Sequence, residues 1–317
     1  MPARTRVSLL QSVCYPNPAF IGGDGLVEFK LFKLIFSVCL ICVFANPSFA
    51  QALHNDTKTF VAPSQMSPSD WTNPSELART WNAALVRVPT GKGRSKKLTT
   101  SRLSNWKPAN AQKVPVVVYM HGCTGVWSGT HYRVKLMADL GFLVVAPVSF
   151  AREKYPQSCD PETHEGGMYR GTLKMRQNDA AFAIQQVRAL TNIDQEIVIL
   201  MGLSQGGITT ATYKARSANT RVTHRIIEGW TCHAGWPEYK GLKAGKAEPT
   251  LSLVGDLDPW FQNKWTKGHC GPFMNRSNGS ASYVFKTGKL AREHELLEHS
   301  QPRQALRQFL QAHQLIQ

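Results

Sequence analysis

The sequence is poor in acidic side chains. Its 317 residues contain 21 Asp and Glu against 37 Lys and Arg, so the formal net charge is +16. A surface of this sign disfavours cationic partners and attracts anionic ones. The basic residues are nevertheless scattered, apart from one cluster at residues 91–97, and no nucleic-acid-binding motif accompanies them. We therefore expect no specific nucleic-acid partner, and at most a weak attraction of a solvated basic surface to anionic surfaces.

The sequence also lacks a long hydrophobic run. Its most apolar stretch, residues 34–45, is short for a membrane-spanning helix, which needs about 20 residues. It follows a short basic segment and precedes Ser48 and Ala50, which occupy the −3 and −1 positions of a cleavage site. This pattern predicts a signal peptide at residues 27–50, cleaved before Gln51. We expect export to a periplasm or to the exterior, with an uncleaved N-terminal anchor as the alternative.

Residues 1–26 do not fit the pattern of a leader. A signal peptide begins with its basic region, so we expect translation to start near Val27 and residues 1–26 to reflect a misassigned start. The mature chain would then begin with a polar segment rich in Pro and Ser, residues 51–73, which we expect to be loose. No internal repeat or further linker divides the remainder, so residues 74–317 are predicted to form one domain.

No metal-binding motif is present, although the segment HELLEH, His294–His299, resembles one. Zinc binding by H-E-x-x-H needs histidines four residues apart on one helical face. Here the spacing is five, which separates the two side chains by roughly 140° around a helix. Glu295 also excludes the reversed H-x-x-E-H form. We expect no metal and no cofactor, and ask instead whether either histidine is catalytic.

Apolar strands alternate with helical patterns from residue 114 onward. The predicted strands are 114–120, 142–148, 196–202, 224–230, 250–255 and 282–287, and the predicted helices are 131–141, 173–190, 206–217 and 301–313. Continuous apolar strands that alternate with helices indicate a parallel sheet covered on both faces. We predict an α/β fold, a three-layer α/β/α sandwich with a mostly parallel central sheet. Ligands of such sheets bind at the carboxyl ends of the strands.

A serine lies between one of these strands and the next helix. The segment MGLSQGG contains G-x-S-x-G, with Gly202, Ser204 and Gly206 at the junction. In a nucleophile elbow the serine occupies a sharp and strained turn, and only residues without side chains fit two positions before and after it. The pattern predicts that Ser204 is a nucleophile and that the backbone N–H of Gln205 donates to an oxyanion.

The second oxyanion donor is expected after the strand at 114–120. The segment MHGCTG places a His-Gly pair where α/β-hydrolases open their oxyanion loop. We assign the donor to the N–H of Cys123, with Thr124 as the alternative. His121 is expected to be a structural histidine rather than the general base.

The chain order Ser, Asp, His predicts where the other catalytic residues lie. The segment LVGDLDPW ends a predicted strand and offers Asp256 and Asp258, of which we favour Asp258 because of its position in the loop. His294 follows the last predicted strand and precedes the last helix, where this fold places its base. We therefore predict that His294 is catalytic and keep His299 as the alternative.

Four cysteines follow the predicted cleavage site, and an even number in an exported chain suggests disulfides. Cys123 and Cys159 follow neighbouring predicted strands, and Cys232 and Cys270 follow another neighbouring pair. All four emerge at the carboxyl edge of the sheet. We predict the bonds Cys123–Cys159 and Cys232–Cys270, each holding a long loop over the catalytic face.

These motifs resemble the dienelactone hydrolase family of α/β-hydrolases, from about Pro115 to Gln311. The resemblance rests on VVVYMHGCTG, on GFLVVAPVSFARE followed by Cys159, on RQNDAAFAIQQVRAL and on GLSQGG. It implies the α/β-hydrolase fold and ester hydrolysis by a nucleophile, Asp and His without a cofactor. The chain departs from the family at two positions: Ser204 replaces a cysteine nucleophile, and Val148 replaces the Asp of a D-S-F segment.

We therefore expect an exported serine hydrolase that acts on small-molecule or polymeric carboxylic esters. A serine peptidase or an acyltransferase would use the same residues. The alternatives from other classes are a non-catalytic binding protein with a relic elbow and an electrostatic binder of nucleic acid or an acidic polymer. The sequence does not define the oligomeric state.

Overall fold

The computed structural model describes residues 60–109 and 112–316. The predicted signal peptide at 27–50, the predicted start near Val27 and the first part of the segment 51–73 lie outside the described residues. Within the described ranges, no helix combines the length and hydrophobicity that a membrane span requires.

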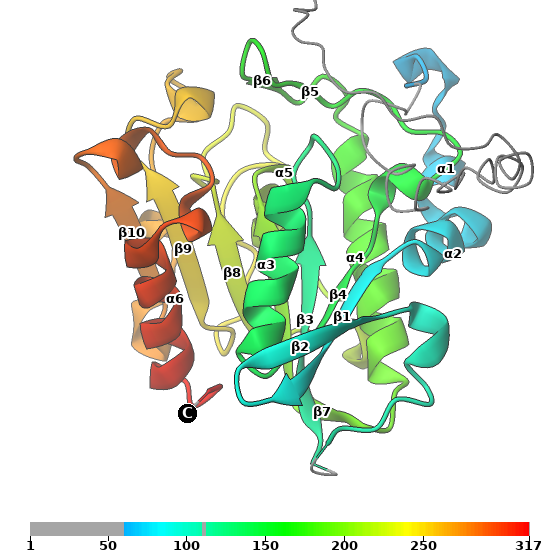
Figure 1. Cartoon of the computed structure of the whole chain (residues 1–317). Coiled ribbons are helices and arrows are strands. Elements are labelled where there is room, and N and C mark those ends of the chain that lie inside the picture. The colour runs from blue at the N-terminus through cyan, green and yellow to red at the C-terminus, as the bar shows by residue number, and fades with distance from the viewer. Residues whose placement is uncertain (1–59, 110–111, 317) are drawn as a thin grey trace, which may run out of the picture. The chain divides into compact units, whose positions relative to one another are not determined.

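An eight-stranded sheet forms the centre of the described domain, with the strand order β10-β9-β8-β7-β3-β4-β1-β2 (Figure 1). The strands are β1 (Leu85–Gly91), β2 (Arg94–Leu98), β3 (Val114–Met120), β4 (Leu143–Ala146), β7 (Ile193–Leu203), β8 (His224–Glu228), β9 (Thr250–Gly255) and β10 (Ala281–Phe285), and β5 (Cys159–Asp160) pairs separately with β6 (Glu165–Gly166). Neighbouring strands from β10 to β4 are parallel, whereas β1 is antiparallel to β4 and β2. The predicted mostly parallel sheet is confirmed.

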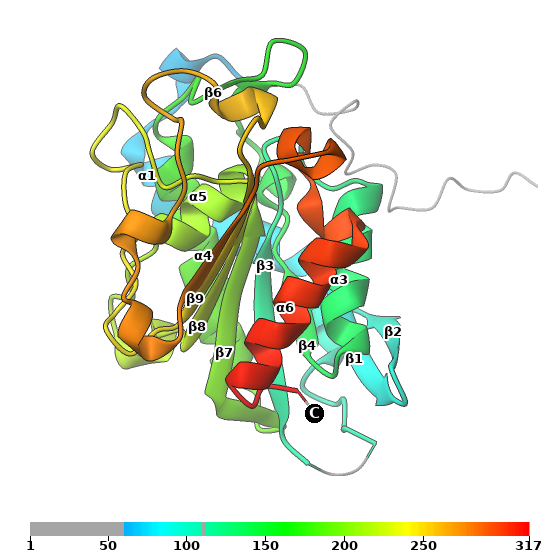
Figure 2. The ribbon, with the colours of Figure 1, turned by 90° about the vertical axis from the view of Figure 1, so that its left-hand side faces the viewer.

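Helices cover both faces of this sheet. They are α1 (Pro68–Thr72), α2 (Pro74–Asn82), α3 (Ser128–Asp139), α4 (Thr172–Arg188), α5 (Gln205–Thr212) and α6 (Ser300–Ala312). In β3, Val117 and Tyr119 belong to the apolar cluster with α3 and α6, whereas Val116 and Val118 belong to the cluster with α4. Successive side chains of a strand point to opposite faces, so a continuous apolar run serves both layers. Figure 2 shows α3 and α6 on one side of the sheet and α4 and α5 on the other.

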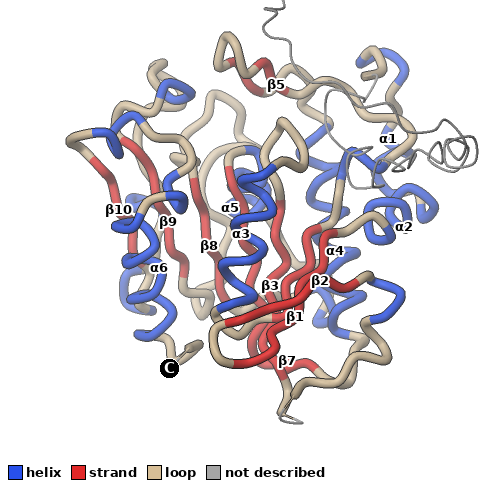
Figure 3. The backbone as a smooth tube through the Cα atoms, viewed as in Figure 1, coloured by secondary structure: helices blue, strands red, loops and turns tan. Residues whose placement is uncertain are grey.

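An antiparallel hairpin, β1–β2, closes one edge of the sheet, where the sequence analysis assigned no element (Figure 3). In β1, Val86 and Val88 are buried, while Leu85, Arg87 and Pro89 are only partly buried. The basic cluster at 91–97 forms the turn and much of β2, and its lysines are exposed. Charged side chains on an edge strand deter pairing with another chain. This placement gives the cluster a structural role at the sheet edge.

Residues 60–73, which the sequence analysis expected to be loose, instead pack against the domain. Residues 68–72 form α1, and the Arg152 guanidinium donates to the Asp70 carbonyl at 2.6 Å. The rings of Phe60 and Phe150 lie 5.9 Å apart in an edge-to-face contact. Phe60, Met66 and Trp71 pack against the apolar core, so this segment is attached to the domain although its overall composition is polar.

Two disulfides are present among the described residues, in the predicted pairing. Cys123 is bonded to Cys159, with 6.0 Å between their Cα atoms, and Cys232 is bonded to Cys270, with 4.8 Å between theirs. The first bond joins the loop after β3 to the start of β5, and the second joins the loops that follow β8 and β9. Each disulfide thus tethers a long loop at the carboxyl end of the sheet.

Replacing Cys232 and Cys270 together with Ala should lower the free energy of unfolding by roughly 3–4 kcal/mol, because the cross-link restricts the unfolded chain. The bond closes a loop of 38 residues in sequence separation. Urea titration of wild type and variant measures the difference, with the reduced wild type as control. Non-reducing peptide maps that link Cys232 to Cys123 would contradict the pairing.

Candidate active site

Ser204 occupies the sharp turn between β7 and α5. Its φ of 57° and ψ of −118° are uncommon for a residue with a side chain. Its backbone N–H donates to the Glu228 carbonyl at 2.9 Å, and its own carbonyl accepts the Ile208 N–H at 2.9 Å. These two bonds hold the strained turn, and Ser204 lines two adjoining cavities at the end of the sheet.

Two glycines make this turn possible because the surrounding backbone is too close for a side chain. A Cβ on Gly202 would lie 2.2 Å from the Gly206 carbonyl oxygen. A Cβ on Gly206 would lie 1.9 Å from the Met120 carbonyl oxygen. Both distances are well below van der Waals contact, so the glycines of G-x-S-x-G are required by the packing of α5 against β7 and β3.

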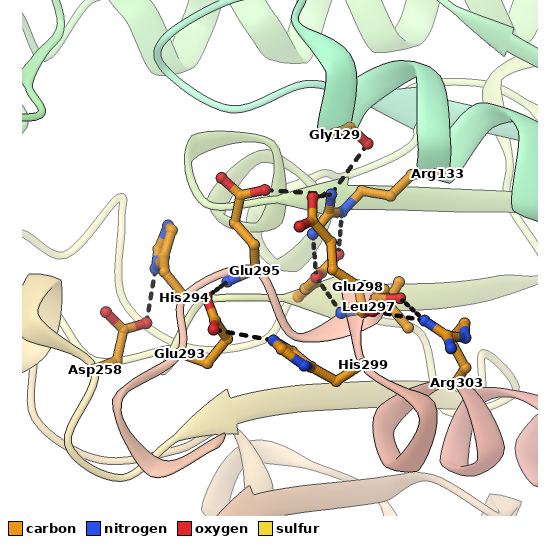
Figure 4. A network of polar contacts seen from close by, with 11 residues as sticks. Gly129, Arg133, Asp258, Glu293, His294, Glu295, Leu297, Glu298, His299 and Arg303 are labelled. Carbon is orange, nitrogen blue, oxygen red and sulfur yellow. Dashed lines mark hydrogen bonds and ion pairs between the residues drawn. The ribbon is translucent and has the colours of Figure 1, made fainter. Parts of the chain in front are cut away.

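His294 and Asp258 are in direct contact (Figure 4). His294 Nδ1–H donates to Asp258 Oδ2 at 2.7 Å. Asp258 is fully buried, and its other carboxylate oxygen accepts the Trp260 N–H at 3.1 Å. His294 Nε2 is buried without a hydrogen-bond partner among the described residues, and His294 lines the same cavity as Ser204.

Asp256 and His299, the alternatives to Asp258 and His294, lie in different surroundings. Asp256 is exposed at the end of β9. His299 directly precedes α6, and its Nε2 contacts Glu293 Oε2 at 3.0 Å. Of the two candidate acids and two candidate bases, only Asp258 and His294 are hydrogen-bonded to each other.

The loop after β3 lies next to the serine. A Cβ on Gly122 would lie 3.8 Å from the Ser204 Cβ. Cys123 and Ser204 line both cavities, whereas Gln205 lines one of them and Thr124 lines the other. The N–H of Gln205 belongs to the first residue of α5, where helix N–H groups and the helix dipole favour negative charge. The loop after β3 and the start of α5 therefore both lie next to Ser204.

His121 supports that loop from beneath. It is buried, its Nδ1–H donates to the Gly122 carbonyl at 2.7 Å, and its Nε2 accepts the Ser149 N–H at 3.1 Å. Burial lowers the pKa of His121, and the positive charge of Arg176 lowers it further. Both ring nitrogens are thus occupied in a neutral imidazole, which fits a structural histidine.

A buried ion pair connects the serine turn to the histidine loop. Arg133 of α3 donates two hydrogen bonds, each of 2.7 Å, to the Glu228 carboxylate, and neither side chain is exposed. Glu228 Oε1 also accepts the Leu297 N–H at 2.7 Å. Because the Glu228 carbonyl accepts the Ser204 N–H, this one residue contacts both the serine turn and the loop that carries His294.

The HELLEH segment supplies two further carboxylates to this arginine (Figure 4). Glu295 and Glu298 lie 3.4 and 3.3 Å from Arg133 Nη1. Burial raises the pKa of Glu295 to about 8, against the attraction of Arg133 and with added repulsion from Glu228 and Glu298. The glutamates that resemble part of a zinc motif therefore bind an arginine. Among the described residues, no group of three or more His, Cys, Asp or Glu could hold a metal ion.

Three supporting residues were missed by the sequence analysis. Arg133 and Glu228 do not belong to any recognisable sequence motif. Gly229 has a φ of +58°, and a Cβ there would lie 3.1 Å from His294 Cε1, so this glycine allows the imidazole to approach β8. A glycine directly after a buried strand, in HRIIEGW, was the available signal for such a close approach.

A family model described as the dienelactone hydrolase family matches residues 104–264, which is just over half of the chain. The chain belongs to the dienelactone hydrolase family. The match contains Ser204 and Asp258 and ends before His294. As a member of the dienelactone hydrolase family, the protein is a hydrolase of the ester-cleaving type.

Several solved structures resemble this member of the dienelactone hydrolase family. One, named m3DLH, is 16% identical with a TM-score of 0.45, over 65% of this chain and 90% of that chain. The apo form of Thermogutta terrifontis esterase 2 is 14% identical with a TM-score of 0.41, over 74% and 90%. A hyperthermophilic esterase from the archaeon Pyrobaculum calidifontis is 16% identical with a TM-score of 0.41, over 78% and 92%. The comparison with curated proteins gives no match.

Replacing Glu228 with Gln should lower the free energy of unfolding by roughly 3–5 kcal/mol, because the buried Arg133 would lose its principal carboxylate. Urea titration measures this loss. The control is Glu298→Gln, which alters a contact of the same arginine at a side chain that is 42% exposed. The Glu298→Gln substitution should lower the free energy of unfolding by less than about 1 kcal/mol. Equal losses in the two variants would contradict a central role for Glu228.

Proposed function

We propose that the protein is an exported serine hydrolase that cleaves carboxylic esters through an acyl-enzyme. The observation that carries the proposal is the 2.7 Å hydrogen bond between His294 and buried Asp258, beside a cavity that His294 shares with Ser204. A nucleophile, a base and an acid that orients the base are the parts this chemistry needs. The strained elbow of Ser204 supports its assignment as the nucleophile.

In the proposed reaction, His294 Nε2 takes the Ser204 hydroxyl proton as Oγ bonds to the carbonyl carbon. The N–H groups of Cys123 and Gln205 stabilise the oxyanion. Collapse of the intermediate breaks the bond to the alcohol oxygen, and His294 passes its proton to that oxygen. Water then loses a proton to His294 and attacks the acyl-enzyme, which releases the carboxylic acid and restores Ser204. Asp258 holds the imidazole with Nδ1 protonated and stabilises its cationic form.

Neighbouring activities would use the same residues. A serine peptidase would cleave an amide, and an acyltransferase would pass the acyl group to an acceptor other than water. Ester hydrolysis is favoured because the family is of the ester-cleaving type. Membership of this family suggests small-molecule esters as substrates. We include polymeric esters among the proposed substrates.

Export is proposed on two grounds. The apolar stretch at 34–45 with its cleavage pattern predicts a signal peptide. The two disulfides are compatible with an oxidising compartment, where such bonds persist. We propose residues 74–317 as the catalytic domain, with residues 60–73 packed against it.

Replacing Ser204 with Ala should lower ester turnover by several powers of ten, because loss of the nucleophile removes the acyl-enzyme route. Turnover of 4-nitrophenyl acetate measures this, and an unchanged urea midpoint shows that the variant is folded. A fluorophosphonate probe should label the wild type and leave the variant unlabelled. Labelling that persists in the variant would show that another residue is the nucleophile.

Paired substitutions distinguish the catalytic His and Asp from their neighbours. His294→Ala and Asp258→Asn should each reduce kcat severely, by about 10⁴-fold for the aspartate. The matched controls His299→Ala and Asp256→Asn should retain turnover within about tenfold of the wild type. The same ester assay decides both pairs. Collapse in a control together with near-normal turnover in its partner would reassign that role.

A further inference from the structure

Two cavities adjoin at Ser204, so each can hold one half of an ester, the acyl half or the alcohol half. The first has a volume of about 460 Å³, and its lining includes Gln205. The second has a volume of about 360 Å³, and its lining includes His294. Ser204, Cys123 and Trp260 line both. An ester bound at the serine can therefore extend in two directions.

The direction of proton transfer assigns the two halves, on the basis of the proposed function. His294 gives its proton to the leaving oxygen, so the alcohol half must lie on the His294 side. His294 lines only the smaller cavity, and Gln205, a proposed oxyanion donor, lines only the larger. We call the smaller one the alcohol cavity and the larger one the acyl cavity.

The acyl cavity has an aromatic and almost uncharged lining. Four of the eight tryptophans of the chain line it, namely Trp230, Trp236, Trp260 and Trp265. No Lys or Arg is among its described lining residues, and Glu165, on exposed β6, is the one carboxylate. Aromatic walls bind flat apolar groups through burial and ring contacts. A carboxylate on the acyl group would lose hydration there, and no Lys or Arg of the lining would compensate for that loss.

The wall around Trp236 is held in place before substrate arrives. The Arg170 guanidinium lies 5.2 Å from the Trp236 ring centroid and also binds Glu238. Tyr239 donates its hydroxyl to the Arg170 carbonyl at 3.1 Å. A Cβ on Gly167 would lie 2.4 Å from the Trp236 ring, so only glycine lets this loop lie against the indole. A preorganised wall loses little entropy when it binds a ring.

The two disulfides tether the walls that enclose this cavity. Cys123–Cys159 holds the loop that contributes residues 164–168, and Cys232–Cys270 holds the loops that contribute residues 234–236, 260, 261, 263, 265 and 266. At the rim, Met168 is 50% exposed and Trp265 is 59% exposed. An acyl group that protrudes from the cavity would therefore meet further apolar surface.

We propose that the protein prefers esters whose acyl half is a bulky, uncharged aromatic group, bound in the acyl cavity. A cavity of 460 Å³ lies in the range that holds a ring with a short linker. The alcohol half occupies the alcohol cavity. The proposed preference therefore concerns the acyl half, which the reaction releases as the carboxylic acid.

Three 4-nitrophenyl esters with the same leaving group test this preference: the acetate, the 3-phenylpropanoate and the 3-(4-carboxyphenyl)propanoate. The kcat/KM of the phenylpropanoate should exceed that of the other two by about tenfold or more. Equal values for the three esters would overturn the acyl preference. In that case, turnover that Ser204→Ala abolishes would leave the proposed function standing. No turnover of any ester would overturn both.

Two tryptophan variants locate the preference in the acyl cavity. Trp236→Ala should lower the ratio of kcat/KM between phenylpropanoate and acetate by about tenfold, because it removes one aromatic wall. Trp127→Ala, which removes an indole from the lining of the alcohol cavity alone, should leave this ratio within about twofold. Urea titrations verify that both variants are folded. An unchanged ratio in Trp236→Ala, or an equal fall in Trp127→Ala, would overturn the assignment of the cavities.

Discussion

The buried pair of Arg133 and Glu228 is the constraint on which the candidate site depends. Burying two charges is costly, and their attraction compensates only when the geometry is good and the remaining polar atoms are satisfied. Here the carboxylate receives two bonds from Arg133 and one from the Leu297 N–H, while the Glu228 carbonyl receives the Ser204 N–H. The pair therefore fixes one relative placement of α3, the serine turn and the histidine loop. We regard it as a determinant of geometry more than of stability.

Close backbone approach is the second constraint at this site. A side chain at Gly202 would meet the Gly206 backbone, and one at Gly206 would meet the Met120 carbonyl of β3. A side chain at Gly229 would displace His294. The three glycines act on different segments, yet each allows a close backbone approach at the end of the sheet. The strain at Ser204 is tolerated because both its N–H and its carbonyl are hydrogen-bonded within this packing.

The features that could be predicted from the sequence were those with a local pattern. Buried parallel strands appear as continuous apolar runs, the elbow as G-x-S-x-G, and the disulfide pairing followed from which loops share an edge of the sheet. Arg133 and Glu228 are 95 residues apart, so no local pattern joins them. The hairpin β1–β2 was not predicted from the sequence because its outer strand, β2, is basic and exposed, as is common for an edge strand. The walls of the acyl cavity come from irregular loops, whose conformation depends on contacts such as that of Gly167 with Trp236.

The disulfide Cys123–Cys159 couples the position of the proposed oxyanion loop to the position of the hairpin β5–β6. Cys123 belongs to the loop proposed to hold the oxyanion, and Cys159 begins the hairpin that forms part of the acyl cavity. His121 and Arg176 anchor the same loop from the core, through the Gly122 carbonyl and the His121 carbonyl respectively. The hairpin is thus attached, through one covalent bond, to a loop whose other contacts are rigid and buried. The position of the hairpin and the position of the proposed oxyanion donor are therefore set together.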